Sequence, residues 1–221
     1  MKWVNLKVVK RIGLMMIGIV GMGVFLSFLI EVNYGTDTCS FMNLALSERF
    51  RISFGTCMVL ANILFFIPEI LLKPKLINIG TIMNMVLIGY ISDYCRVLWS
   101  RFLPQTLFTL QPYRTITFLI ALFPFLVSVA LYMNADMGLA PYDAIPTIIS
   151  LRTHLPYTVI RILWDFSAIL IGVLAGKHLS VATVVMALSI GPSVTFIGNF
   201  MKYISRKEPK QNSTGFNTSN G

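Results

Sequence analysis

Residues Ile12–Ile30, IGLMMIGIVGMGVFLSFLI, contain no charged side chain. A helix of about 20 apolar residues is long enough to cross a hydrocarbon core of about 30 Å. Similar apolar segments follow, so spans are predicted at about 11–31, 55–72, 77–98, 114–133, 157–176 and 181–201. In lipid every backbone donor and acceptor needs an internal partner, and the alternating segments of a β-barrel do not occur. The sequence therefore predicts an all-α membrane protein with six transmembrane helices.

The composition of the 221-residue chain agrees with a membrane protein. Hydrophobic residues make up 56% and charged residues 12%, whereas soluble domains carry about 25% charged residues. The formal net charge of +9 needs no nucleic-acid partner, because Lys and Arg collect at the cytoplasmic ends of spans. With the amino terminus inside, more Lys and Arg residues fall on cytoplasmic than on external segments. Both termini are therefore predicted to be cytoplasmic, and the lipid bilayer is the main partner.

The two halves of the chain follow the same pattern. Offsets of 103 and then 102 residues align Gly35 with Gly138, Arg49 with Arg152, and Thr81 with Thr183. Each half has three spans, so the second half must be inverted in the membrane, as in many transporters. The predicted organisation is a basic terminus (1–10), repeat 1 (11–98), an external connector (99–113), repeat 2 (114–201) and a disordered tail (202–221).

Each predicted repeat includes a stretch too short to cross the membrane, at about 35–50 and 138–153. Non-helical backbone at membrane depth is tolerated where protein or a water-filled cavity shields it. The two stretches are therefore predicted either to be re-entrant or to lie on the surface as amphipathic helices. Pro141 suits a first helical position, but Pro146 is expected to break the second stretch into two short turns.

Ionisable residues inside predicted spans are the first candidates for function, because each costs about 2.5–3.5 kcal/mol to insert. Arg161 and Asp165 are four apart on the fifth span, so they share a face and can form an ion pair. Asn62 corresponds to Asp165 in the repeat, and Asn84 lies on the third span. We expect these four residues either to line a substrate or ion pathway or to hold helices together.

Two more carboxylates follow the glycines that open the short stretches. Asp37 and Asp143 are expected to cap helix starts, or to help bind an ion or polar solute if those starts point into the protein. Glu69 precedes Lys73 by four residues and is expected to form an ion pair at a helix end. The three cysteines are expected to be small apolar residues, and neither a metal site nor a cofactor is predicted.

Several motifs resemble those of the YczE/YyaS/YitT family of bacterial membrane proteins. They are Gly35–Leu44 (GTDTCSFMNL), Ser53–Thr56 (SFGT), Ile79–Asp93 (IGTIMNMVLIGYISD), Gly138–Pro146 (GLAPYDAIP) and Arg161–Asp165 (RILWD). Thr38 and Cys57 stand where the family often has a proline and an aromatic residue, and the last span lacks a Gly-Thr pair like Gly80-Thr81. The resemblance implies a multi-span protein of the bacterial inner membrane without an established substrate.

A transporter or channel for a small polar solute is the function that these observations favour. A membrane scaffold or accessory protein, whose buried polar groups only hold helices together, is the alternative. An enzyme is not expected, because the chain has only His154 and His178 as histidines and contains no HExxH or GxSxG motif.

Overall fold

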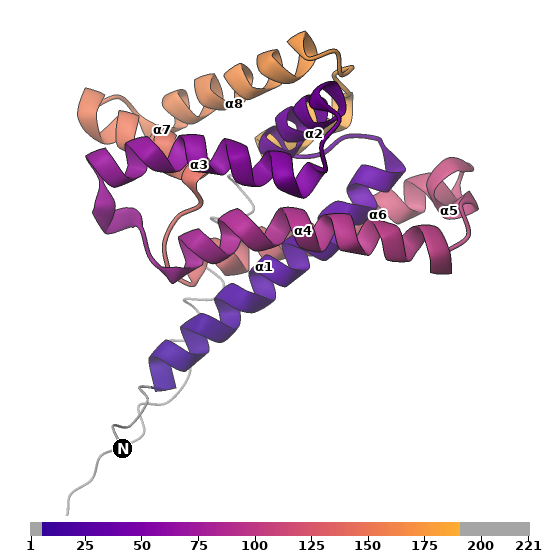
Figure 1. Ribbon diagram of the computed structural model, residues 1–221, viewed down its shortest axis with the longest axis horizontal. Helices are drawn as coiled ribbons and strands as arrows, with labels where there is room; N and C mark the ends of the chain where they lie inside the picture. Colours follow the sequence, from indigo (N-terminus) through magenta and orange to yellow (C-terminus); the bar gives the residue numbers. More distant parts are fainter. Residues whose placement is uncertain (1–5, 191–221) are drawn as a thin grey trace, which may run out of the picture.

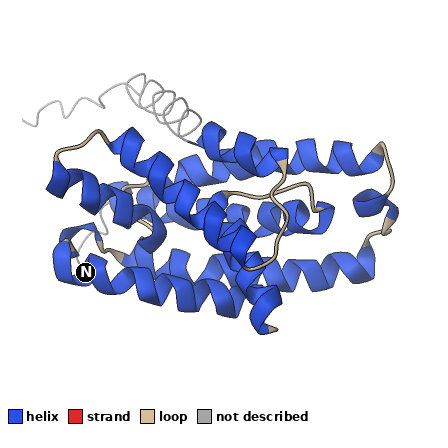
Figure 2. Cartoon of the chain, turned by 90° about the horizontal axis from the view of Figure 1, so that it is seen from above, coloured by secondary structure: helices blue, strands red, loops and turns tan. Residues whose placement is uncertain are grey.

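The computed structural model describes residues 6–190, and in this part of the chain all regular structure is helical (Figure 2). The elements in chain order are α1 (Leu6–Val32), α2 (Thr38–Phe50), α3 (Phe54–Leu72), η1 (Pro74–Leu76), α4 (Ile79–Phe102), α5 (Thr106–Thr109), α6 (Tyr113–Asn134), α7 (Pro141–Thr153) and α8 (Tyr157–Leu174). A last helix covers Val181–Ile190. The predicted tail and the rest of the sixth span lie outside the described residues.

Four described helices are long and apolar enough to cross a membrane: Val8–Val32, Phe54–Leu72, Tyr113–Asn134 and Tyr157–Leu174. Large apolar side chains such as Leu64, Phe123 and Leu174 are exposed on these helices. Such surfaces fit lipid rather than water, so the helices indicate a membrane-embedded protein. The predicted third span forms α4, a 24-residue helix, but its polar residues leave it outside this apolar set. The count of six spans therefore stays a prediction.

The helices form two groups, with α1, α4 and α6 below α2, α3, α7 and α8 in the view of Figure 1. Helices α1 and α6 are antiparallel: Arg11 lies 3.1 Å from Asp136 at one end. At the other end Arg114 donates from Nε to the Val32 carbonyl at 2.8 Å. Below, we call the end of the bundle near Arg11 the first end and the end near Val32 the second end.

Glycines on α1 allow its neighbours to approach closely. A Cβ on Gly18 would lie 2.7 Å from the backbone nitrogen of Tyr132, and one on Gly21 would collide with Ser128. A Cβ on Gly23 would lie 2.6 Å from Ile91 of α4. Gly18, Gly21 and Gly23 therefore allow close packing within one chain, whereas a Cβ on Gly13 would meet nothing within 4 Å.

The same backbone conformations recur 103 residues apart. Left-handed or otherwise positive φ angles occur at the aligned pairs Asn33 (51°) and Asp136 (54°), Gly35 (146°) and Gly138 (106°), and Arg51 (56°) and His154 (57°). Helices α2 and α7, which lie between the second and third pairs, each have 13 residues. L-residues rarely adopt positive φ. Three matched pairs therefore indicate a similarity between the two halves of the chain more strongly than the few sequence identities do.

One expectation about the second stretch is wrong. Pro146 lies inside α7, which continues without a break from Pro141 to Thr153. Pro146 has no N–H to donate to the Tyr142 carbonyl four residues earlier, and a proline ring crowds that carbonyl. Pro146 is almost fully buried, so its packing offsets the loss of one helical hydrogen bond.

The contact between α1 and α6 can be tested with two glycines of one helix. Gly18→Ala places a methyl group against the Tyr132 nitrogen and the Ser128 carbonyl, backbone atoms that cannot rotate away. Overpacking costs about 1–3 kcal/mol, so the variant should unfold several degrees below wild type in detergent. Gly13→Ala, in open space on the same helix, is the control and should not lose stability. Equal melting temperatures for both variants would contradict the packing described here.

Candidate functional site

A cavity of about 990 Å³ lies between the helices, with a wall formed by residues from Met22 to Ile190. Its wall includes all six residues that the sequence singled out: Asp37, Asn62, Asn84, Asp143, Arg161 and Asp165. They come from the segment before α2 and from α3, α4, α7 and α8. Asn62 and Asp165 are the ninth residues of α3 and α8, helices of 19 and 18 residues. These two side chains therefore lie about halfway along the helices that carry them.

Arg161 is the centre of the polar network on this wall. Its Nε donates to Asp165 Oδ2 at 2.9 Å, so the predicted contact between these residues is present. Its Nη1 donates to Asp143 Oδ1 at 2.5 Å. Both carboxylates and the guanidinium are largely buried, and a buried charge requires such partners. Asp143 therefore belongs to an ion-pair triad rather than acting as the predicted helix cap, and the N-cap of α7 is Ala140.

The remaining oxygen of Asp165 connects the two short helices. Thr38, the first residue of α2, donates to Asp165 Oδ1 at 2.7 Å. The hydroxyl of Tyr142, in the first turn of α7, donates to the same atom at 2.8 Å. The two hydroxyls are also 3.2 Å apart. Both short helices therefore start beside the midpoint of α8.

Thr38 and Tyr142 were not among the residues predicted from the sequence. Both lie within the motifs that open the short stretches, as the last residues of GTDT and GLAPY. The repeat aligns Thr38 with Pro141, one residue before Tyr142. That near-alignment was the signal available, and it could not by itself show that both hydroxyls reach one carboxylate.

Asp37 caps the start of α2, which is one of the two roles predicted for it. Its Oδ2 accepts from the backbone nitrogen of Ser40 at 3.1 Å. Its Oδ1 is buried and has no hydrogen-bond partner among the described residues. Asp37 is thus the wall carboxylate that no cation of the described residues neutralises.

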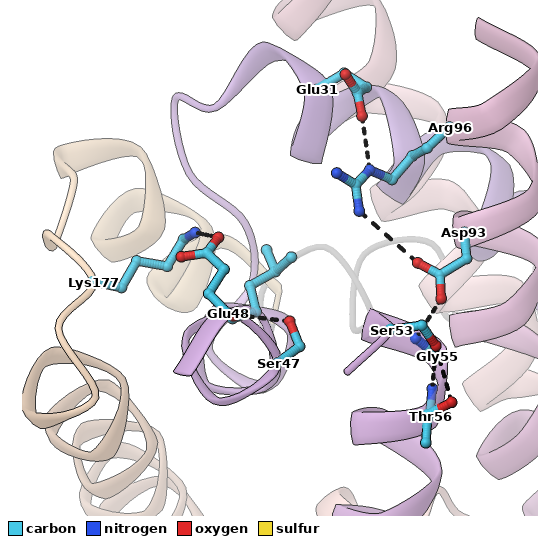
Figure 3. A network of polar contacts seen from close by, with 10 residues as sticks. Glu31, Ser47, Glu48, Ser53, Gly55, Thr56, Asp93, Arg96 and Lys177 are labelled. Atoms are coloured by element: carbon cyan, nitrogen blue, oxygen red, sulfur yellow. Dashed lines mark hydrogen bonds and ion pairs between the residues drawn. The ribbon is translucent and has the colours of Figure 1, made fainter. Parts of the chain in front are cut away.

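A second hollow, a cleft of about 1010 Å³, opens at the second end of the bundle. Figure 3 shows the charged residues on its two sides. On one side Glu48 of α2 pairs with Lys177. On the other side Arg96 of α4 donates to Glu31 at 2.7 Å and lies 3.8 Å from Asp93.

The cleft and the cavity are near neighbours along α1. Leu26 lines the cavity, and Leu29, about one helical turn further on, lines the cleft. Likewise Ser40 lines the cavity and Phe41 lines the cleft. The two spaces therefore share α1 and α2 in their walls.

The first end of the bundle is closed by backbone contacts between the two halves of the chain. Gly80 donates its N–H to the Met137 carbonyl at 2.8 Å, and Leu139 donates to the Leu76 carbonyl at 3.2 Å. A Cβ on Gly138 would lie 2.8 Å from the Asn78 nitrogen. A Cβ on Gly35 at the second end would lie just as close to the Thr183 nitrogen, at 2.7 Å, so the two ends differ in the backbone hydrogen bonds and not in the closeness of the glycine turns.

The expected ion pair between Glu69 and Lys73 is wrong. Glu69 is 0% exposed, and neither of its carboxylate oxygens has a hydrogen-bond partner among the described residues. The spacing of four residues predicted the pair from helix geometry alone. Pro68 lies directly before Glu69 inside α3, and the face that carries Glu69 packs into the protein rather than reaching the surface.

The described residues contain no cluster of His, Cys, Asp or Glu that could hold a metal ion. The three cysteines are free, with Cys57 and Cys95 buried and Cys39 partly buried on the cavity wall. The cavity wall presents charged groups, amides and hydroxyls on residues such as Arg161, Asn62 and Tyr142.

Comparison with known proteins extends over most of the chain. Residues 9–199 match the model of DUF6198, a family of unknown function. The chain belongs to the DUF6198 family. It is also 26% identical over 159 residues to an uncharacterized protein of Haemophilus influenzae, an alignment that covers 72% of this chain and 68% of the relative. No solved structure matches. The resemblance to the YczE/YyaS/YitT family stays a prediction.

The ion-pair triad of Asp143, Arg161 and Asp165 in this DUF6198 protein can be tested by its effect on stability. Arg161→Met leaves the carboxylates of Asp143 and Asp165 buried without their cation, and breaking a buried pair costs about 3–5 kcal/mol. The variant should therefore have a much lower melting temperature in detergent than wild type. Adding Asp143→Asn and Asp165→Asn should restore part of the loss, because two uncompensated charges disappear.

Arg101→Met is the matched control, since Arg101 is exposed near the end of α4. Its loss should change the melting temperature little. If Arg161→Met were no more harmful than Arg101→Met, the triad would not be the structural centre described above.

Proposed function

We propose that this protein is a transporter or channel for a small polar solute, built from two inverted repeats of three spans. The observation that carries the proposal is the cavity itself. Its wall collects polar and charged side chains from five parts of the chain around one space. Intramembrane ionisable groups are expensive, and a cavity that can hold a polar solute gives them a role that helix packing alone does not.

The inverted repeat is supported by geometry that recurs along the chain. The first helix of each proposed repeat, α1 or α6, runs antiparallel to the other. Three matched pairs of residues with positive φ surround the short helices. An inverted pair of elements would bring α2 and α7 to the centre from opposite faces, and both begin next to Asp165. We therefore interpret α2 and α7 as re-entrant half-helices.

The two ends of the bundle differ in a way that suits alternating access. The first end is closed by the hydrogen bonds from Gly80 to Met137 and from Leu139 to Leu76. The second end has the cleft, which shares α1 and α2 with the wall of the cavity. A transporter of this class moves between states in which one end or the other is open. The present arrangement corresponds to a state closed at the first end.

A scaffold is the competing proposal, and buried polar groups alone would suit it equally well. The cavity of about 990 Å³ favours transport, because holding helices together does not require a space of this size with ionisable side chains on its wall. By the excess of Lys and Arg, the first end faces the cytoplasm of a bacterial inner membrane in our proposal.

Accessibility labelling tests the inverted arrangement. In a chain with its three cysteines replaced, Lys73→Cys at the first end and His178→Cys at the second end should react from opposite sides of the membrane. A membrane-impermeant maleimide should label His178→Cys in intact cells and Lys73→Cys only after permeabilisation. Both positions are exposed. Arg101→Cys, which is exposed near the end of α4, should behave like His178→Cys. Labelling of Lys73→Cys and His178→Cys from the same side of the membrane would contradict the proposed inverted repeat.

Solute flux tests the function directly. Proteoliposomes are shrunk with choline chloride, glycine, ribitol or sodium gluconate, and re-swelling followed by light scattering reports entry. At least one solute should enter faster than into empty liposomes, and Asp165→Asn should slow its entry at least tenfold. If no solute enters faster than into empty liposomes, with wild type and variant alike, the result contradicts transport and favours the scaffold.

A cross-link across the cleft tests the mechanism in the same assay. Glu48→Cys with Arg96→Cys joins the two sides of the cleft, whereas Glu48→Cys with Lys177→Cys joins residues on one side. A short bifunctional thiol reagent should abolish flux in the first pair and spare it in the second. Flux that survives both cross-links would indicate an open channel instead of alternating access.

A further inference from the structure

We infer that the central cavity binds a small organic cation, with Asp37 as the anionic group that holds it. The inference rests on the proposed function, because it assigns a class of solute to the same cavity. It depends on the charges of the wall, on the free carboxylate oxygen and on the apolar remainder of the lining.

The charges on the wall favour a cation. Among the residues that the structure describes, the charged ones that line the cavity are three carboxylates, on Asp37, Asp143 and Asp165, and one guanidinium, on Arg161. The starts of α2 and α7 also point positive dipole ends at this centre, each equivalent to about half an elementary charge. Even with both dipoles counted, the wall keeps about one net negative charge.

That remaining negative charge belongs to Asp37. Arg161 is occupied by Asp143 and Asp165 at 2.5 and 2.9 Å, so it is not available to a fourth group. Asp37 uses Oδ2 to accept from Ser40, while its Oδ1 has no partner among the described residues. An ionised carboxylate in a buried site is unfavourable without a cation. A bound ammonium group would supply the missing charge.

The rest of the lining suits an organic ion better than a bare metal ion. Met22, Met58, Phe125 and Met133 contribute apolar walls, and flexible methionine side chains adapt to ligands of different shape. Tyr142 and Tyr157 bring aromatic rings to the same space, and such rings attract cations. A hard inorganic cation would need a shell of oxygen ligands, whereas an amine with an apolar body uses the carboxylate and the apolar walls together.

Three ligands of nearly the same shape and different charge separate the possibilities. Purified full-length protein in detergent is titrated by calorimetry with benzylammonium, benzyl alcohol and benzoate, with empty micelles as the blank. Benzylammonium should bind at least tenfold more tightly than either of the others. Asp37→Asn should reduce its affinity at least tenfold. An asparagine caps a helix as well as aspartate does, so the variant should keep its fold.

Asp136→Asn is the matched control. It makes the same chemical change at a side chain that is 79% exposed and outside the cavity wall, and asparagine tolerates its left-handed backbone. Its affinity for benzylammonium should equal that of wild type. If Asp37→Asn failed to fold, the order of the three ligands on wild type would still decide the inference.

The inference would be overturned if benzoate or benzyl alcohol bound as tightly as benzylammonium, if none bound, or if folded Asp37→Asn and Asp136→Asn kept equal affinity. None of these results would by itself remove the proposed function. Entry of ribitol or gluconate in the flux assay would then keep transport and change its class of solute.

Discussion

Arg161 is the charge on which the centre of the protein depends. It lies between Asp143 of α7 and Asp165 of its own helix. The other carboxylate oxygen of Asp165 accepts hydrogen bonds from the hydroxyls of Thr38 and Tyr142. Burying three charged groups is tolerable only if all of them are paired and hydrogen-bonded. The starts of α2 and α7 must therefore meet at the middle of α8, and the position of the half-helices and the pairing of the charges require each other.

Glycine makes that meeting sterically possible. Gly35 and Gly138 adopt positive φ, and each lies against the start of a helix in the opposite half of the chain. A Cβ on Gly35 would collide with Ser180 and Thr183, and one on Gly138 would collide with Thr81. The chain can turn back toward the centre only where such a side chain is missing. The two turns thus fix the short helices and hold the halves together at once.

The sequence predicted local features better than meetings between distant ones. The spacing of Arg161 and Asp165 predicted their contact, because helix geometry alone decides which residues share a face. The offset of the repeat identified Asn62, and the motif glycines marked the two short helices. Thr38 and Tyr142 could not be predicted as partners of Asp165, because their hydroxyls reach it only through the packing of α2 and α7 on α8. Glu69 was misjudged for the same reason, since spacing says nothing about which face of α3 is buried.

The difference between the two ends of the bundle can be traced to atoms. By the offsets of the proposed repeat, the bond from Gly80 to Met137 corresponds to one from Ala182 to Tyr34. In the described chain, residues 34–36 and 178–182 share no such backbone hydrogen bond. At that end, charged side chains such as Glu48, Lys177 and Arg96 line the cleft instead. These ion pairs lie within each side of the cleft and do not cross it. The first end is thus joined by backbone hydrogen bonds between the two halves of the chain, whereas the corresponding segments at the second end lie close together without them.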